Sequence, residues 1–163
     1  GAREGGVVQR VSRQRLLDAH RLAAPLRNAA KEPHVHALVG LIVDDEADIL
    51  EIAREMLETL GYTVIATESG EKAIDIFTAQ KDAIDLVILD MIMSPMDGET
   101  VYERLRAIDP EVPVLLSSGY SKSRQADAIL DKGCNGFIQK PFNLQTLNRK
   151  IRNIFDQTGA EPS

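Results

Sequence analysis

The sequence lacks what several protein classes require. Its 163 residues contain one cysteine, Cys134, and no tryptophan, so an intrachain disulfide framework is excluded. No apolar run approaches the roughly 18 residues of a membrane helix, and residues 1–6 do not resemble the start of a secretion signal. With 11 glycines and 7 prolines, the chain is neither collagenous nor of low complexity. We expect a globular protein of the reducing cytoplasm, with no membrane segment in this fragment.

The charge is unevenly distributed along the chain. The net charge of −6 combines +4 in residues 1–37, where seven Lys/Arg face three Asp/Glu, with −10 in residues 38–163. This change predicts a boundary near residue 37, with residues 1–37 forming an N-terminal extension or linker helix. An acidic main body argues against direct nucleic-acid binding, because phosphate contacts need clustered cations.

From residue 38 onward, short apolar runs alternate with stretches of helical period, which is typical of βαβ units and a parallel sheet. The continuous Val, Ile and Leu runs suit strands covered on both faces. The pattern predicts an α/β domain over residues 38–157, a doubly wound sheet of five parallel strands in the flavodoxin-like order 2-1-3-4-5, followed by a tail at 158–163. The predicted strands are Leu38–Val43, Thr63–Ala66, Leu86–Leu89, Val112–Leu116 and Gly136–Ile138.

Polar side chains follow four of the five predicted strands. Asp44, Asp45 and Glu46 follow the first strand and Asp90 follows the third. Ser117 and Ser118 follow the fourth strand, and Lys140 follows the fifth. In doubly wound sheets, ligands bind outside the carboxyl ends of the strands. Each residue alone would often be a solvated turn, a helix cap or a surface lysine. Their joint placement predicts a functional site.

Carboxylates gathered at one edge repel one another unless a cation neutralises them. Two or three carboxylates at an open site suit Mg²⁺, which shares its coordination with water and phosphoryl oxygens. Asp90 stands apart from the other acids in the sequence and could serve as a nucleophile that forms an aspartyl phosphate. Lys140 and Ser118 could then stabilise phosphoryl oxygens.

Four segments resemble the receiver domain of bacterial two-component response regulators, and their order and spacing match over residues 38–157. They are Leu41-Ile42-Val43-Asp44-Asp45-Glu46, Asp85-Leu86-Val87-Ile88-Leu89-Asp90, Met96-Asp97-Gly98 and Lys140-Pro141-Phe142.

The resemblance implies a phosphorylatable signalling switch in a phosphorelay, with a sensor histidine kinase or a histidine phosphotransfer protein as partner. It implies Asp90 as phosphoacceptor, Mg²⁺ bound directly by Asp45 and through water by Asp44, and a lysine whose bond to Pro141 is usually cis. The remaining implied roles are the main-chain carbonyl of Ile92 as a metal ligand, Ser118 as switch hydroxyl, Phe137 as aromatic switch and Lys140 as phosphoryl-binding lysine.

The resemblance also implies that the domain catalyses its own phosphorylation and dephosphorylation. Its output face would comprise the fourth helix, fifth strand and fifth helix, through which a homodimer could form. Ile92 and Tyr120 would border the approach of hydrolytic water; neither readily orients an attacking water as Gln, Glu or Asn might, and both are bulky enough to obstruct one.

One departure and several alternatives accompany this interpretation. Ser94 stands where the family commonly has proline, and Pro95 follows it.

The run Leu115–Ser121 is similar to receivers attached to hybrid sensor kinases, so the alternative is the C-terminal receiver of a hybrid histidine kinase acting as a relay. The sequence favours two further hypotheses about function less strongly. One is a phosphohydrolase with an Asp nucleophile, which usually has a second Asp where this chain has Ile92. The other is a non-phosphorylated docking module.

Overall fold

A computed structural model describes residues 38–119 and 124–160. The predicted helix within residues 1–37 and the side chain of Tyr120 lie outside this range. No helix in the described part of the chain is both long and apolar enough to cross a membrane. The elements are β1 (Val39–Val43), α4 (Ala47–Thr59), β2 (Thr63–Thr67), α5 (Gly70–Gln80), β3 (Leu86–Asp90), α6 (Gly98–Ile108), β4 (Val114–Ser118), α7 (Arg124–Asp131), β5 (Gly136–Gln139) and α8 (Leu144–Ala160).

The five strands form one parallel sheet in the order β2-β1-β3-β4-β5, which confirms the predicted flavodoxin-like fold. The strand order reverses between β1 and β3, which are hydrogen-bonded neighbours with Val43 opposite Leu89. In folds of this type, the crevice at such a reversal is the usual ligand site.

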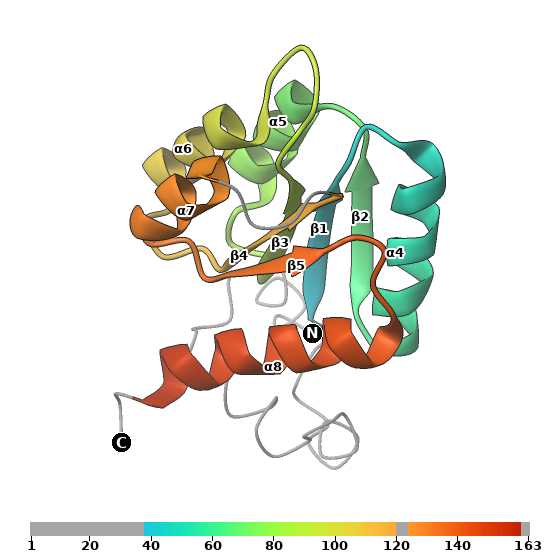
Figure 1. The fold of residues 1–163 in the computed structure, drawn as a ribbon. Helices are drawn as coiled ribbons and strands as arrows, with labels where there is room; N and C mark the ends of the chain where they lie inside the picture. The colour runs from blue at the N-terminus through green and yellow to red at the C-terminus, as the bar shows by residue number, and fades with distance from the viewer. Residues whose placement is uncertain (1–37, 120–123, 161–163) are drawn as a thin grey trace, which may run out of the picture.

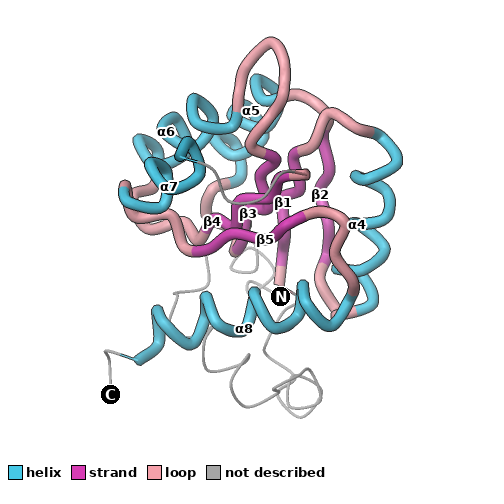
Figure 2. Tube along the Cα trace, in the orientation of Figure 1, coloured by secondary structure: helices cyan, strands magenta, loops and turns pink. Residues whose placement is uncertain are grey.

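Helices cover both faces of the sheet (Figures 1 and 2). Helices α5, α6 and α7 cover one face, where Phe77, Val101 and Ile129 pack against strand residues such as Leu41. Helices α4 and α8 cover the other face and pack against the neighbouring Ile42. Successive strand residues therefore point into different layers, as the two-residue period of a strand requires. Burial on both faces explains the continuous apolar strands.

Local signals in the sequence mark where helices begin and end. The Asp97 carboxylate accepts a hydrogen bond from the Thr100 N–H at 2.9 Å, which caps the start of α6. Asn143 caps α8 in the same way. Gly61 adopts a φ of 97° just after α4, a left-handed conformation that glycine tolerates best.

The structure moves several predicted boundaries. Strand β4 begins at Val114 rather than 112, because Pro113 has no N–H to donate to the sheet, and it continues through Ser117 and Ser118. Asp90 is the last residue of β3 rather than the first residue after it. Helix α8 continues to Ala160, beyond residue 157. The remaining strands differ from prediction by one residue at one end.

Candidate functional site

The carboxyl ends of the strands place the predicted site residues around one cleft. Asp44 follows β1, Asp90 ends β3, Ser118 ends β4 and Lys140 follows β5. The cleft has a volume of about 530 Å³. Its lining residues are Asp45, Glu46, Ile49, Asp90, Ile92, Gly119, Lys140 and Pro141.

Lys140 links the elements of the cleft. Its Nζ lies 2.9 Å from Asp44 Oδ2 and 3.4 Å from Asp90 Oδ1. Its backbone N–H donates to the Ser118 carbonyl at 2.7 Å, which fixes the start of the segment after β5. The Lys140–Pro141 peptide bond is cis, as the resemblance implies, and the Ser94–Pro95 bond is also cis. Burial alone would lower the pKa of Lys140, but Asp44 and Asp90 together outweigh burial and raise it.

The cleft contains a cluster of three acids. Carboxylate oxygens of Asp44, Asp45 and Asp90 all lie within 4.8 Å of one another; Asp44 and Asp90 are buried, whereas Asp45 is exposed. Burial first, and the charge of Asp44 second, raise the pKa of Asp90 to about 6, although Lys140 and the Ile92 backbone N–H lower it. One ammonium therefore compensates the buried acids only in part.

This donor set fits a hard divalent cation. It offers carboxylate oxygens alone, close enough to share one ion, and one carboxylate faces solvent. Burial first, and the neighbouring charge of Asp44 second, make the ionised form of Asp90 unfavourable, and a bound cation would relieve both effects. Asp44, Asp45 and Asp90 could therefore hold a metal such as Mg²⁺, which accepts few protein ligands and retains water.

The other predicted residues lie in or near the cleft. Ile92 is 49% exposed at its edge, and its N–H contacts the Asp90 carboxylate. Ser118 is buried, and the β4–β5 register places it opposite Gln139. Phe137 is half-buried and packs against the core beneath α5, α6 and α7.

Two residues near the cleft have contacts that the strand-end pattern did not predict. Glu46 Oε1 lies 3.6 Å from the Lys140 ammonium, so Glu46 is a third carboxylate near this cation. Gly98 packs against the backbone of β3: a Cβ built at this position would lie 2.5 Å from the Asp90 carbonyl oxygen and 2.7 Å from the Met91 Cα. The Met96-Asp97-Gly98 motif identified Gly98 as a family residue, but the sequence did not indicate its contact with the backbone of β3.

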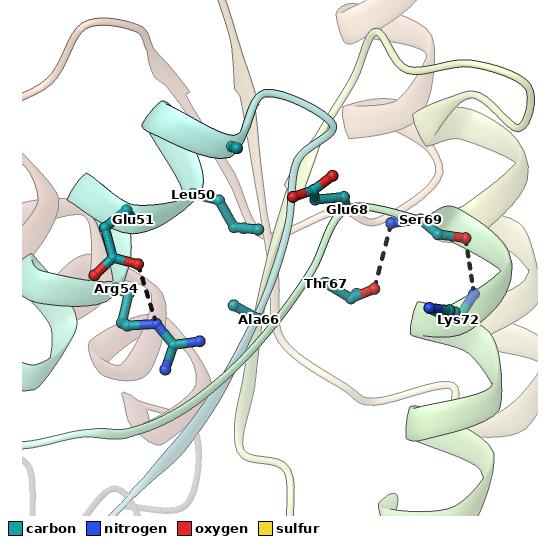
Figure 3. Close-up of a pocket in the computed structure, with 9 residues that line it drawn as sticks. Leu50, Glu51, Arg54, Ala66, Thr67, Glu68, Ser69 and Lys72 are labelled. Atoms are coloured by element: carbon teal, nitrogen blue, oxygen red, sulfur yellow. Dashed lines mark hydrogen bonds and ion pairs between the residues drawn. The ribbon is translucent and has the colours of Figure 1, made fainter.

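A larger cavity, of about 720 Å³, lies between α4 and the start of α5 (Figure 3). Its charged side chains are of both signs, and Arg54 pairs with Glu51 on its own helix at 3.7 Å. None of the predicted phosphorylation or metal residues lines it. Asp45, Asp90, Ile92 and Lys140 line the smaller cleft instead.

Fold and site together define a flavodoxin-like domain with an acidic, lysine-containing cleft at the point where strand order reverses. A family model described as the response regulator receiver domain matches residues 41–152. The chain belongs to this family.

Relatives with different architectures share this domain. The probable transcriptional regulator ycf27 of Porphyridium aerugineum is 34% identical over 114 residues, covering 70% of this chain and 46% of the relative. Response regulator MprA of Mycolicibacterium vanbaalenii is 31% identical over 118 residues, covering 72% and 50% respectively. Sensor kinase CckA of Brucella abortus is 29% identical over 136 residues, covering 79% of this chain and 14% of the kinase. The chain thus spans half or less of these relatives.

Solved structures show the same fold. A response regulator receiver domain protein from Clostridium thermocellum superposes with a TM-score of 0.70 at 28% identity, covering 74% of this chain and 96% of that chain. A chain of the CheX–CheY–BeF3–Mg²⁺ complex from Borrelia burgdorferi gives a TM-score of 0.69 at 28% identity, covering 72% and 89%.

Proposed function

We propose that this domain is a phosphorylatable switch in which Asp90 accepts a phosphoryl group from a phosphohistidine. An Asp90 carboxylate oxygen attacks phosphorus while the phosphorus–nitrogen bond breaks, and the released imidazole nitrogen takes up a proton. The sensor histidine kinase or histidine phosphotransfer protein is the donor. The observation that carries the proposal is the buried Asp90 carboxylate beside Lys140 and two further aspartates in an open cleft.

The surrounding residues have complementary roles in this proposal. Asp45, Asp90 and the main-chain carbonyl of Ile92 would hold Mg²⁺ directly, and Asp44 would hold it through water. When bound, the metal offsets the charge between the carboxylate and the incoming phosphoryl group. The Lys140 ammonium, 3.4 Å from Asp90, contacts a phosphoryl oxygen. The Ser118 hydroxyl contacts another, and Phe137 changes its burial as the output signal.

The proposal places the output in α7, β5 and α8, which also form the homodimer surface. Phosphorylation adds about −1.5 to −2 charges at the cleft. This charge shifts the equilibrium between an inactive and an active conformation of these elements. The protein would act in the cytoplasm without binding nucleic acid through this domain. Beryllofluoride-induced NMR shifts that extend from Asp90 into α7 and β5 would support this output. Shifts confined to residues next to Asp90 would contradict it.

The test of the phosphoacceptor is the intact mass after incubation with Mg²⁺ and acetyl phosphate. Wild type should gain one phosphoryl group, and Asp90→Asn should gain none. Asp75→Asn, a substitution on the exposed side of α5, is the matched control and should react like wild type. An equal mass gain in Asp90→Asn would overturn the assignment. The reaction should also slow sharply in Asp45→Asn, because the metal would lose a charged ligand.

The second candidate is a relay receiver within a hybrid histidine kinase, which the similarity to the sensor kinase CckA favours. A relay passes the phosphoryl group from Asp90 to a histidine on another protein. Incubating the phosphorylated domain with a purified histidine phosphotransfer protein distinguishes the two roles. Rapid movement of label to that protein supports the relay, whereas retention on Asp90 supports a terminal switch.

A further inference from the structure

Helix α6 directs a row of polar and aromatic side chains at the turn between α7 and β5. The row is spaced at three and four residues, so its members lie on one side of the helix. The Lys132 ammonium lies 2.9 Å from Glu99 Oε2 and also pairs with Glu103. The Tyr102 hydroxyl donates to the Lys132 carbonyl at 3.3 Å. The last member of the row, Arg106, reaches the residues immediately before β5.

Arg106 makes two hydrogen bonds to this turn. Its Nη2 donates to the Gly133 carbonyl and to Asn135 Oδ1, each at 3.0 Å. The guanidinium carbon of Arg106 lies over the Tyr102 ring, 5.1 Å from its centre, so a cation–π contact helps to hold the arginine side chain in place. Gly133 has a φ of 103°, a conformation that lets the chain turn back beneath Arg106.

Asn135 joins this turn to the sheet at the first residue of β4. Its Oδ1 accepts from the Val114 N–H at 2.9 Å, and its own N–H donates to the Val114 carbonyl at 3.1 Å. Both backbone groups of Val114 are therefore paired with Asn135. The pairing sets the β4–β5 register, in which Leu115 lies opposite Gly136 and Ser118 opposite Gln139.

The same register determines where Lys140 lies. Lys140 follows directly after β5, and its N–H donates to the Ser118 carbonyl at 2.7 Å. A slip of one residue would turn every side chain of β5 to the opposite face of the sheet. Asn135 lies just before β5 and Lys140 just after it, and β5 has four residues. The contacts of Asn135 therefore help to fix the position of the Lys140 ammonium beside Asp90.

We propose that Arg106 is a positioning residue for Lys140, acting through Asn135 and the register of β5. The inference rests on the proposed phosphoryl transfer, because it assigns Arg106 a role in that reaction without contact with the reacting atoms. Arginine suits this position because its planar guanidinium donates to two acceptors in a fixed geometry. The site thus depends on α6 at both ends: Gly98 contacts the Asp90 backbone, and Arg106 holds the turn before β5.

The first test is amide hydrogen exchange by NMR on the full chain, comparing wild type, Arg106→Gln and Arg104→Gln. Arg104 is two residues away on the same helix and exposed, so its substitution removes the same charge. Exchange of the Asn135 and Lys140 amides should be about tenfold faster in Arg106→Gln. The amide of the buried Asp85, bonded to the Val39 carbonyl at the end of the sheet away from the cleft, reports global opening and should be unchanged.

Arg104→Gln should match wild type at every amide. Unchanged exchange at Lys140 in Arg106→Gln would overturn the proposal, and so would an equal acceleration at Asp85, which indicates a general loss of stability. Asn135→Ala provides an independent variant that leaves Arg106 intact and should accelerate the same two amides.

The second test is the rate of phosphorylation by acetyl phosphate. Arg106→Gln and Asn135→Ala should react at least threefold more slowly than wild type, and Arg104→Gln at the wild-type rate. Normal rates in Arg106→Gln despite faster exchange at Lys140 would overturn its role in the reaction. Failure of the wild type to react would instead refute the proposed function, and exchange would still decide whether Arg106 holds Lys140.

Discussion

The Lys140 ammonium and the Asp44 carboxylate lie 2.9 Å apart although 96 positions separate them in the chain. The contact exists because β1 and β5 both end at the same edge of the sheet. Lys140 also lies 3.4 Å from Asp90, so one cation is shared between two buried acids. The protein's own cation therefore offsets the charge of these acids only in part, and this balance determines how the domain responds to pH and to Mg²⁺.

The raised pKa of Asp90 predicts a pH-dependent stability in the absence of metal. This pKa is about 6 in the folded chain, against an ordinary value of 3.8. The folded state therefore binds the proton more tightly, so the stabilisation is complete below about pH 4 and is lost as pH rises through about 6. Asp90→Asn should raise the free energy of unfolding at pH 7 by about 1–3 kcal/mol, and much less at pH 4.

Urea denaturation at the two pH values measures this difference, with Asp75→Asn as the control for loss of an exposed charge. An equal rise in the unfolding free energy of Asp90→Asn at pH 4 and pH 7 would contradict the role of the raised Asp90 pKa. Mg²⁺ should stabilise the wild type at pH 7 more than it stabilises Asp90→Asn, because ligand binding to the folded state alone adds stability.

The close contact of Gly98 with β3 predicts that Gly98→Ala is damaging. The added Cβ would meet the Asp90 carbonyl and the Met91 backbone, neither of which can move without displacing the end of β3. We expect a loss of about 1–3 kcal/mol in unfolding free energy, typical of overpacking, together with slower phosphorylation. Gly119→Ala is the control for stability, because a Cβ there meets no atom within 4 Å. Equal stability of the two variants would refute the steric argument.

Exposed isoleucines beside the cleft predict a surface for the protein phosphodonor. Ile52 is 49% exposed on α4, three residues beyond the cleft residue Ile49 and thus on the same side of the helix. Ile52→Glu should reduce the rate of phosphotransfer from a histidine phosphotransfer protein about tenfold, since apolar anchors contribute most to such interfaces. Its rate with acetyl phosphate, which needs no docking surface, should be unchanged.

Thr59→Glu adds the same charge at the far end of α4 and should not affect either rate. An equal decrease with both donors in Ile52→Glu would indicate damage to the cleft rather than to docking.

Ile92 predicts a long-lived phosphoryl state. Its side chain lines the cleft, and it cannot orient an attacking water. Ile92→Asn should hydrolyse phosphorylated Asp90 about fivefold faster, equivalent to ~1 kcal/mol in the barrier. The first-order loss of label at fixed Mg²⁺ and pH measures the rate, with Ile92→Val as the apolar control. A rate in Ile92→Asn equal to or below that of wild type would refute the shielding argument.

The sequence predicted the sheet because its strands are continuous apolar runs, and predicted the site because polar residues follow those runs. It misplaced the end of β4 because Ser117 and Ser118 interrupt the apolar pattern, although both are buried in the strand. Hydrogen bonds within the sheet outweighed the polarity of these side chains.

Contacts between distant segments could not be derived in this way. The pairing of Arg106 with Asn135 spans 29 positions and depends on how α6 lies against the turn before β5. A pattern read along the chain identifies neither partner, because an arginine on a helix and an asparagine in a turn are both ordinary surface residues. The resemblance implied roles for Asp90 and Lys140, but it implied none for Arg106.

The Gly98 N–H donates to the Met91 carbonyl at 2.9 Å, which closes residues 91–98 into a ring at the end of β3. Both ends of this ring are fixed, one by the sheet and the other by the start of α6. An inserted or deleted residue within it would break the closure or shift α6 relative to Asp90. The β3–α6 connection is therefore constrained more in its number of residues than in their identity, apart from Gly98.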